Sequence, residues 1–234
     1  MATFKVRVED KIGSVGDDAA LSDFLTAGAK FIVNILPAER VEKFTSDLTD
    51  AGTGISVTTA RILRAHKSGY GARKIDAGLA TQAVDSGSIH FSSIIDPVWY
   101  ILNGVAFVKP FGGTVVGMAY PTVAFGDSTI TAFPADLDEG VVLYACIHGR
   151  LRQMSDLTIT TLGGLASVIS VSYTNVDTAL TNQDIELASG HLNKVQTQIS
   201  EFSSRIAQYS QQYQQLASGL TILKSEFNDY IKSI

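Results

Sequence analysis

The stretch from Leu192 to Leu216, LNKVQTQISEFSSRIAQYSQQYQQL, carries few charges and much Gln and Ser, yet its apolar residues recur in steps of three and four. The same spacing continues in both directions, from Ile185 to Ile234, without a break. A sustained period of 3.5 residues is the heptad repeat of helices that wind around each other in a left-handed supercoil. The spacing therefore predicts a long C-terminal helix, residues 183–234, whose apolar seam faces a partner.

Heptad positions follow when Ile185 is placed at position a. The a positions are then Ile185, Leu192, Ile199, Ile206, Tyr213, Leu220, Phe227 and Ile234, and the d positions are Ala188, Val195, Phe202, Tyr209, Leu216, Leu223 and Tyr230. We predict that this seam is an interface with other chains. Its predicted contact residues are Ile185, Leu192, Val195, Ile199, Phe202, Ile206, Tyr209, Tyr213, Leu216, Leu220, Leu223 and Phe227.

The e and g positions beside the seam are almost all small or uncharged, such as Ser203 and Gln212. Ordinary two-stranded coiled coils place Glu and Lys there to select a partner. Neutral flanks favour close packing against several neighbours instead. In the alternative interpretation, the helix folds back onto its own domain. Separately, the run Ala217-Ser218-Gly219 weakens the helix and leaves open a kink or hairpin near residue 218.

The composition excludes several classes of protein. The chain has 234 residues, a formal net charge of −5 and one cysteine, Cys146. An acidic chain is unlike a dedicated nucleic-acid binder, and one cysteine excludes an intrachain disulfide. The N-terminal sequence MATFKVRVEDKIG has no apolar core of signal-peptide length, and no apolar run reaches membrane-spanning length. We therefore expect a soluble protein made in the cytoplasm.

The order of the patterns predicts an α+β fold: a helical-bundle core with an antiparallel β insertion and the long C-terminal heptad-repeat helix. Helical spacing predicts a core from residues 1–53 plus 134–154. Residues 54–133 have β character, with a hairpin predicted at Asn103-Gly104, a pair that favours a type I′ turn. A short helix is expected at residues 74–84. Residues 155–182, rich in Thr and Ser, are predicted to form a connecting arm, either a hairpin around Gly163-Gly164 or a flexible segment.

The sequence contains no pattern typical of catalysis. The four histidines have no metal-ligand spacing with each other or with Cys146, and neither a phosphate-binding loop nor a nucleophile elbow occurs. We therefore predict a protein that is not an enzyme, with no metal and no cofactor.

One local cluster of charge stands out in the acidic chain. Five basic residues lie within the stretch RILRAHKSGYGARK: Arg61, Arg64, Lys67, Arg73 and Lys74. They are candidates for docking an acidic partner or for contact with DNA in a channel. The alternative is an ordinary solvated corner. Arg61 and Arg64 lie three apart on a predicted strand, which places them on opposite faces.

Four stretches resemble the head-to-tail connector, or neck adaptor, proteins of tailed bacteriophages. They are SDFLTAGAKFIVNILPAERVEKFTSDL, RAHKSGYGARKIDAGLATQAVDSGSIHFSSIIDPVWYI, FPADLDEGVVLYACIHGRLRQM and NQDIELASGHLNKVQTQISEFSSRI. The resemblance is a general pattern over most of the chain and includes no catalytic signature.

This resemblance implies a virion structural protein in the neck, assembled in the host cytoplasm. It implies a dodecameric ring of identical chains below the portal protein. Such a ring extends the DNA channel, in passive contact with genomic DNA, and is a platform for downstream neck or tail proteins. By analogy, residues 183–234 would dock on the portal or on neighbouring subunits.

Two other functions remain open. The heptads also fit a trimeric coiled-coil fibre or another tail-associated structural protein, in which residues 185–234 form a free parallel coil. A regulator or binding module, whose β region holds a small ligand, is a third hypothesis.

Overall fold

The computed structural model describes residues 2–49, 52–182 and 185–234, with residues 158–169 and 172 described by their backbone. It confirms the predicted α+β class. The elements are, in chain order, α1 (Phe4–Ile12), α2 (Asp18–Ile35), α3 (Ala38–Glu42), β1 (Ser46–Thr49), β2 (Ile55–Ser56), β3 (Ala60–Lys67), β4 (Tyr70–Gly71), β5 (Arg73–Lys74), η1 (Ala77–Leu79), η2 (Gln82–Val84), β6 (Val98–Leu102), β7 (Val105–Lys109), β8 (Thr114–Ala119), η3 (Ala135–Leu137), α4 (Asp138–Thr181) and α5 (Ile185–Ser233).

The chain divides into two compact units. The first consists of Met1–Lys5, Ser22–Val142 and Ile234, and the second of Val6–Leu21 and Leu143–Ser233. This division differs from the predicted one, in which residues 1–53 and 134–154 share one helical core. Most of α2 and all of α3 belong to the unit that holds the strands.

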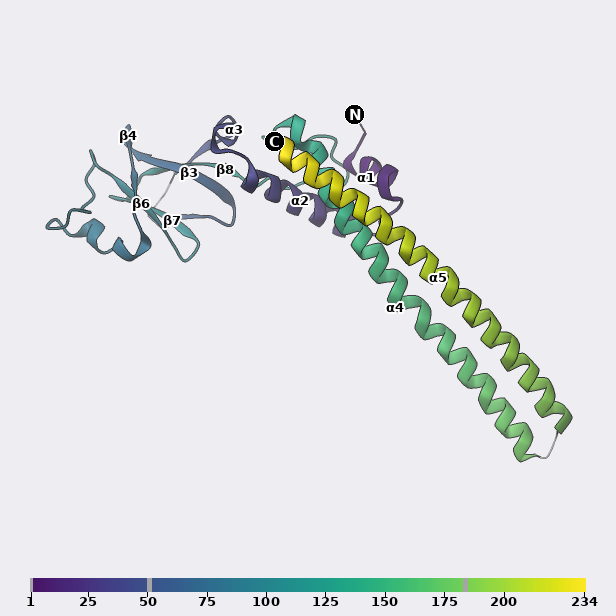
Figure 1. Ribbon diagram of the computed structural model, residues 1–234. Helices are drawn as coiled ribbons and strands as arrows, with labels where there is room; N and C mark the ends of the chain where they lie inside the picture. Colours follow the sequence, from purple (N-terminus) through teal and green to yellow (C-terminus); the bar gives the residue numbers. More distant parts are fainter. Residues whose placement is uncertain (1, 50–51, 183–184) are drawn as a thin grey trace. The chain divides into compact units, whose positions relative to one another are not determined.

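Two four-stranded sheets form the centre of the first unit (Figure 1). Their strand orders are β1-β8-β3-β4 and β2-β7-β6-β5, and every pairing is antiparallel except that of β5 with β6. Buried residues from both sheets meet in one core, which is how stacked sheets exclude water. The members of this core are Ala65 and Val115 from the first sheet and Trp99 and Val108 from the second.

The hairpin predicted at Asn103-Gly104 is confirmed. Strands β6 and β7 pair from Val98 with Lys109 to Leu102 with Val105. Asn103 and Gly104 both have positive φ, 51° and 75°, as a type I′ turn requires.

Strand β3 contains a bulge that was not predicted from the sequence. Arg61 pairs with Met118 and Arg64 with Val116, so Leu63 is an extra residue opposite β8. Met118 and Val116 lie two apart and share a face, and the bulge therefore brings Arg61 and Arg64 onto one face as well. The prediction that these two arginines lie on opposite faces is wrong.

Two further predictions are wrong near the strands. Within the helical core predicted for residues 1–53, helix α3 ends at Glu42, because Ser46–Thr49 pair with β8 as strand β1. The β region therefore begins before residue 54. In place of the short helix at residues 74–84, the chain forms strand β5 and the two 3-10 turns η1 and η2, which pack on the outer face of the second sheet.

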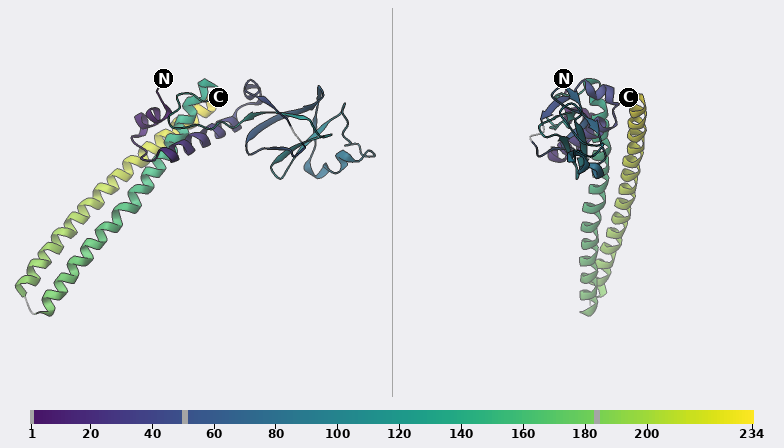
Figure 2. Two further views of the ribbon diagram at one scale, coloured as in Figure 1. Left: turned by 180° about the vertical axis from the view of Figure 1, so that it is seen from behind. Right: turned by 90° about the vertical axis from the view of Figure 1, so that its left-hand side faces the viewer.

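Helices α4 and α5 dominate the second unit. They run side by side in opposite directions as a long hairpin, and both views show the pairing (Figure 2). The C-terminal helix is confirmed from Ile185, while residues 183–184 lie outside the described residues. It continues through Gly219, so the kink or hairpin considered near residue 218 does not occur.

The connecting arm predicted at residues 155–182 is wrong, because α4 is helical from Asp138 to Thr181. Threonines disfavour helices partly through their hydroxyl groups, but here the hydroxyls bond within the helix. Thr174, Thr178 and Thr181 each donate to the carbonyl oxygen four residues earlier. The paired α5 supplies an apolar surface, which stabilises helices more than intrinsic propensity does.

Candidate interaction surface

The structure divides the heptad seam of α5 into two parts. Every d residue is buried or half-buried, and Val195, for example, is 3 % exposed. Five consecutive a residues are exposed, from 42 % at Ile199 and Ile206 to 80 % at Ile185. We call these five the outer row: Ile185, Leu192, Ile199, Ile206 and Tyr213.

Helix α4 of the same chain is the neighbour of the buried part of the seam. Towards the end of α5, the ring of Phe227 meets that of Tyr144 edge-on, with ring centroids 6.0 Å apart. Near the hairpin tip, Val176 and Ala179 of α4 are buried, as is Ala188 of α5. The prediction that the whole seam meets other chains is therefore wrong for its inner residues. Those that are buried within the chain are Val195, Leu220, Leu223 and Phe227.

The surroundings of the outer row change along the helix: Glu186, Lys194, Glu201 and Arg205 lie beside its first part, whereas its last part is uncharged. No charged residue occurs between Arg205 and Lys224. Leu180 and Leu187 are also exposed near the hairpin tip, so the apolar surface broadens there around Ile185. Exposed apolar residues that repeat over this length are typical of a protein–protein contact.

The part of the hairpin near the chain end is tied to the N-terminal segment by polar contacts. Gln153 of α4 donates to the carbonyl oxygens of Ile12 and Ser14, at 3.1 and 2.8 Å. Arg152 lies 2.9 Å from Asp17, which also accepts hydrogen bonds as the N-cap of α2. The N–H group of Ala20, together with Arg152, lowers the pKa of the Asp17 carboxyl. We call this set of contacts, between α4 and residues 12–17, the N-terminal joint.

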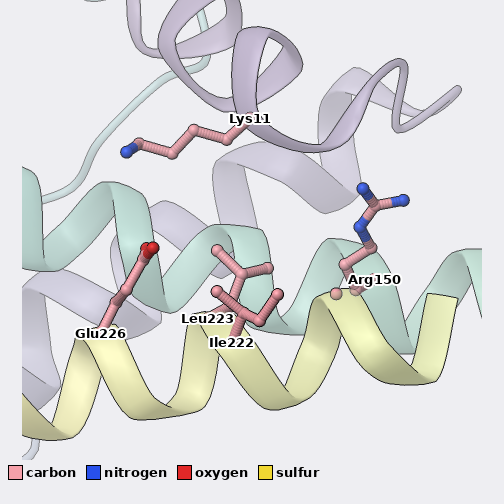
Figure 3. Close-up of a pocket in the computed structure, with 6 residues that line it drawn as sticks. Lys11, Arg150, Ile222, Leu223 and Glu226 are labelled. Carbon is pink, nitrogen blue, oxygen red and sulfur yellow. The ribbon is translucent and has the colours of Figure 1, made fainter. Parts of the chain in front are cut away.

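A cavity of about 260 Å³ opens beside this joint (Figure 3). It is lined by Lys11 of α1, by Arg150 of α4, and by Gly219, Ile222, Leu223 and Glu226 of α5. Arg150 donates to Gln153 at 3.0 Å, while its buried Nε has no hydrogen-bond partner among the described residues. The polar side chains of this lining are those of Lys11, Arg150 and Glu226, and it includes no hydroxyl or thiol group.

His148 and Cys146 both lie on α4. The half-buried His148 ring is tilted against that of Tyr144, with ring centroids 4.6 Å apart, and burial lowers the pKa of His148. Cys146 is buried. Within the described residues, no group of His, Cys, Asp or Glu side chains has the arrangement of a metal site.

The first two candidate basic residues hold the first unit together. Arg61 donates to the carbonyl oxygens of Val33 and Leu36 at the C-terminal end of α2, at 2.5 and 2.6 Å. A guanidinium there satisfies carbonyl groups that have no partner within the helix. Arg64, on the same face of β3, lies 2.7 Å from Glu42 of α3.

The other three basic residues also have partners within the first unit. Lys67 donates to the carbonyl oxygen of Phe111, Arg73 lies 3.0 Å from Asp96, and Lys74 lies over the ring of Trp99. Each of the five residues therefore contacts a different group within the chain. Their arrangement favours the interpretation as an ordinary corner of the fold.

The sequence analysis missed an apolar loop in the first unit. The segment from Val84, the last residue of η2, to β6 exposes five large apolar side chains, and Ile89 is 88 % exposed. We call residues 84–95 the apolar loop. Its exposed residues are Val84, Ile89, Phe91, Ile94 and Ile95. The signal in the sequence is the run SIHFSSII, which is apolar but has neither helical nor strand periodicity.

Among the described residues, no helix combines the length and apolar character that crossing a membrane requires. Comparison with known proteins found no match: no family model, no curated protein and no solved structure matches this chain.

Proposed function

We propose that this protein is a structural assembly protein of a virion: a head-to-tail connector, or neck adaptor, of a tailed bacteriophage. In this role it forms a dodecameric ring below the portal protein. The ring extends the DNA channel and is a platform for the next neck or tail protein. The protein acts without a metal, a cofactor or a chemical reaction.

The outer row of α5 carries this proposal. Within the hairpin, α5 buries one face against α4. The packing of these two helices does not require apolar residues on another face of α5. Ile185, Leu192, Ile199, Ile206 and Tyr213 nevertheless repeat there at every seventh position. Burying such side chains on association is favourable by about 25 cal/mol per Å² of apolar surface. The location in a virion and the ring form are proposed from the resemblance of the sequence to neck adaptors.

The antiparallel hairpin argues against the trimeric fibre. In a free parallel coil the d residues of α5 would face other copies of α5. Here residues such as Val195 and Leu223 are already buried within one chain. A fibre would have to separate α5 from α4 before it could form.

The test compares two variants that add the same charge to opposite faces of α5. Ile199→Asp with Ile206→Asp places two carboxylates in the outer row. Ser204→Asp with Gln211→Asp places them at heptad position f, facing away from the seam. The molar mass of each full-length protein is measured by light scattering after size exclusion, and particle shape by negative-stain electron microscopy.

We expect rings from the wild type and from the position-f variant, and monomers from the outer-row variant. Circular dichroism should show equal helix content in all three, since both pairs of sites are exposed. A wild-type protein that is monomeric or trimeric at every concentration would overturn the proposal, as would an outer-row variant that still forms rings.

A further inference from the structure

The cavity beside the N-terminal joint contains a guanidinium group that has no partner anion. Arg150 is half-buried, and within the described part of the chain no carboxylate lies close enough to pair with it. Its Nη1 donates to Gln153 at 3.0 Å, while its buried Nε has no acceptor among the same residues. A charged donor that is withdrawn from water without an acceptor is unfavourable. The site therefore favours an anion from outside the chain.

Arg152, two residues further along α4, shows the usual arrangement. It lies 2.9 Å from Asp17 and 3.9 Å from Asp156, so carboxylates of the chain itself balance its charge. Both arginines lie at the N-terminal joint, but of the two only Arg152 has such a partner within the described residues. The packing of the joint therefore accounts for Arg152 and leaves the charge of Arg150 unexplained.

Gln153 holds the guanidinium of Arg150 in place. The amide nitrogen of Gln153 donates to the carbonyl oxygens of Ile12 and Ser14, and its amide oxygen accepts from Arg150. An amide that is bonded at both ends fixes the group bonded to it, as supporting residues do in binding sites. The bond to Gln153 uses one nitrogen of Arg150 and leaves the rest of this donor fork for a further acceptor.

Gly219 of α5 leaves space beside this guanidinium. A Cβ at this position would lie 3.7 Å from Nε and 3.9 Å from Nη2 of Arg150. Glycine inside a helix is unfavourable relative to alanine, yet α5 is helical on both sides of Gly219. A long side chain here would enter the cavity, since both residues line it. Glycine therefore keeps the cavity open next to the unpaired charge.

The rest of the lining indicates which anion fits. Figure 3 shows Arg150 at one end of the cavity, Lys11 and Glu226 at the other, and the apolar side chains of Ile222 and Leu223 between them. Lys11 and Glu226 have opposite charges, so one monoanion balances the lining. A volume of about 260 Å³ equals the share of about eight or nine water molecules, at about 30 Å³ each. A carboxylate with a chain of about six carbons has this size.

We infer that this cavity binds a short aliphatic carboxylate. The carboxylate accepts hydrogen bonds from Arg150, and the chain lies on Ile222 and Leu223. Pockets for small molecules commonly combine an apolar lining with a few polar groups that fix the orientation. All the lining residues belong to the second unit, and none belongs to the outer row. The inference is therefore independent of the proposed ring, and either can fail without the other.

Isothermal titration calorimetry on the full-length protein tests the ligand class. The probe is hexanoate. Hexylamine has the same chain with the opposite charge, and inorganic phosphate has the negative charge without the chain. We expect one hexanoate per chain with a Kd of about 1 mM or lower, and binding of the other two at least about tenfold weaker. No binding of hexanoate would overturn the inference, as would equally tight binding of hexylamine or phosphate.

Two leucine variants test the location of the site. Gly219→Leu places a side chain in the cavity and should weaken hexanoate binding at least about tenfold. Ser218→Leu, at the exposed neighbouring position, is the matched control and should bind like the wild type. Melting curves without ligand confirm that both variants fold, and hexanoate should raise the Tm of the control only. Unchanged binding by Gly219→Leu, or equal loss in both variants, would contradict binding in this cavity.

A third variant tests the role of the charge. Arg150→Gln keeps a polar side chain but removes the positive charge, so hexanoate affinity should fall at least about tenfold while hexylamine affinity does not. An Arg150→Gln protein that folds and binds hexanoate like the wild type would show that the carboxylate lies elsewhere. If this variant does not fold, the comparison of Gly219→Leu with Ser218→Leu decides.

Discussion

At the scale of single residues, the bulge at Leu63 shows how one position determines what its neighbours contact. The extra residue turns Arg61 and Arg64 to one face of β3, where Arg61 reaches the end of α2. On the neighbouring strand β8, Gly117 pairs with Ile62, the residue before the bulge. A Cβ on Gly117 would lie 2.7 Å from the carbonyl oxygen of Arg61, closer than backbone atoms tolerate. The bulge and this glycine are therefore required together.

Gly117→Ala should destabilise the protein by about 1–3 kcal/mol, the usual cost of overpacking a closely packed site. The free energy of unfolding is measured from denaturant titrations followed by tryptophan fluorescence, since Trp99 lies in the core of the same unit. Gly126→Ala is the control, because nothing lies within 4 Å of its Cβ position. Equal stability of the two variants would show that strand β8 can move away from the bulge.

At the scale of elements, α5 carries two faces with different roles on one helix. The d residues are buried or half-buried within the hairpin, and the outer row is exposed. Adjacent residues of α5 can therefore differ widely in burial, because they point to different sides of the helix. Leu223 is 7 % exposed, and Ile222 beside it is 59 % exposed.

Leu223→Ala should lower the free energy of unfolding by about 2–5 kcal/mol, the range for truncating a buried leucine. Ile222→Ala removes a side chain of equal size from an exposed site and should cost less than about 1 kcal/mol. Urea denaturation followed by far-ultraviolet circular dichroism measures both, because α4 and α5 dominate the helical signal. A similar loss in both variants would mean that α5 does not pack on α4 through its d residues.

At the scale of the whole molecule, the chain is acidic, but the row proposed for assembly is apolar. The net charge is −5. Like charge on every copy opposes association weakly and over distance, whereas the outer row attracts only on contact. In the proposed assembly, apolar contact and not charge therefore determines where two copies join.

Assembly should accordingly be insensitive to screening of charges. Between about 0.05 M and about 0.5 M NaCl the association constant should stay within about threefold or rise, since salt screens repulsion between the acidic copies. Sedimentation velocity at several protein concentrations measures it. A tenfold fall over this range would instead identify ion pairs as the main contacts and would contradict an apolar interface.

Some features of this protein follow from the sequence alone, because they depend on residues close together in the chain. The heptad spacing determined the C-terminal helix, and Asn103-Gly104 determined the turn between β6 and β7. The predicted α+β class is confirmed for the same reason, since helical and strand periods are local patterns.

Other features were decided by tertiary structure, because they depend on which surfaces meet. Pairing with β8 made residues 46–49 a strand, and pairing with α5 extended α4 to Thr181. The period of the seam shows that a partner exists, but it does not show that α4 of the same chain covers the d residues. The exposure of Ile89 and Ile95 likewise depends on the fold of the whole unit, since their apolar character alone would favour burial.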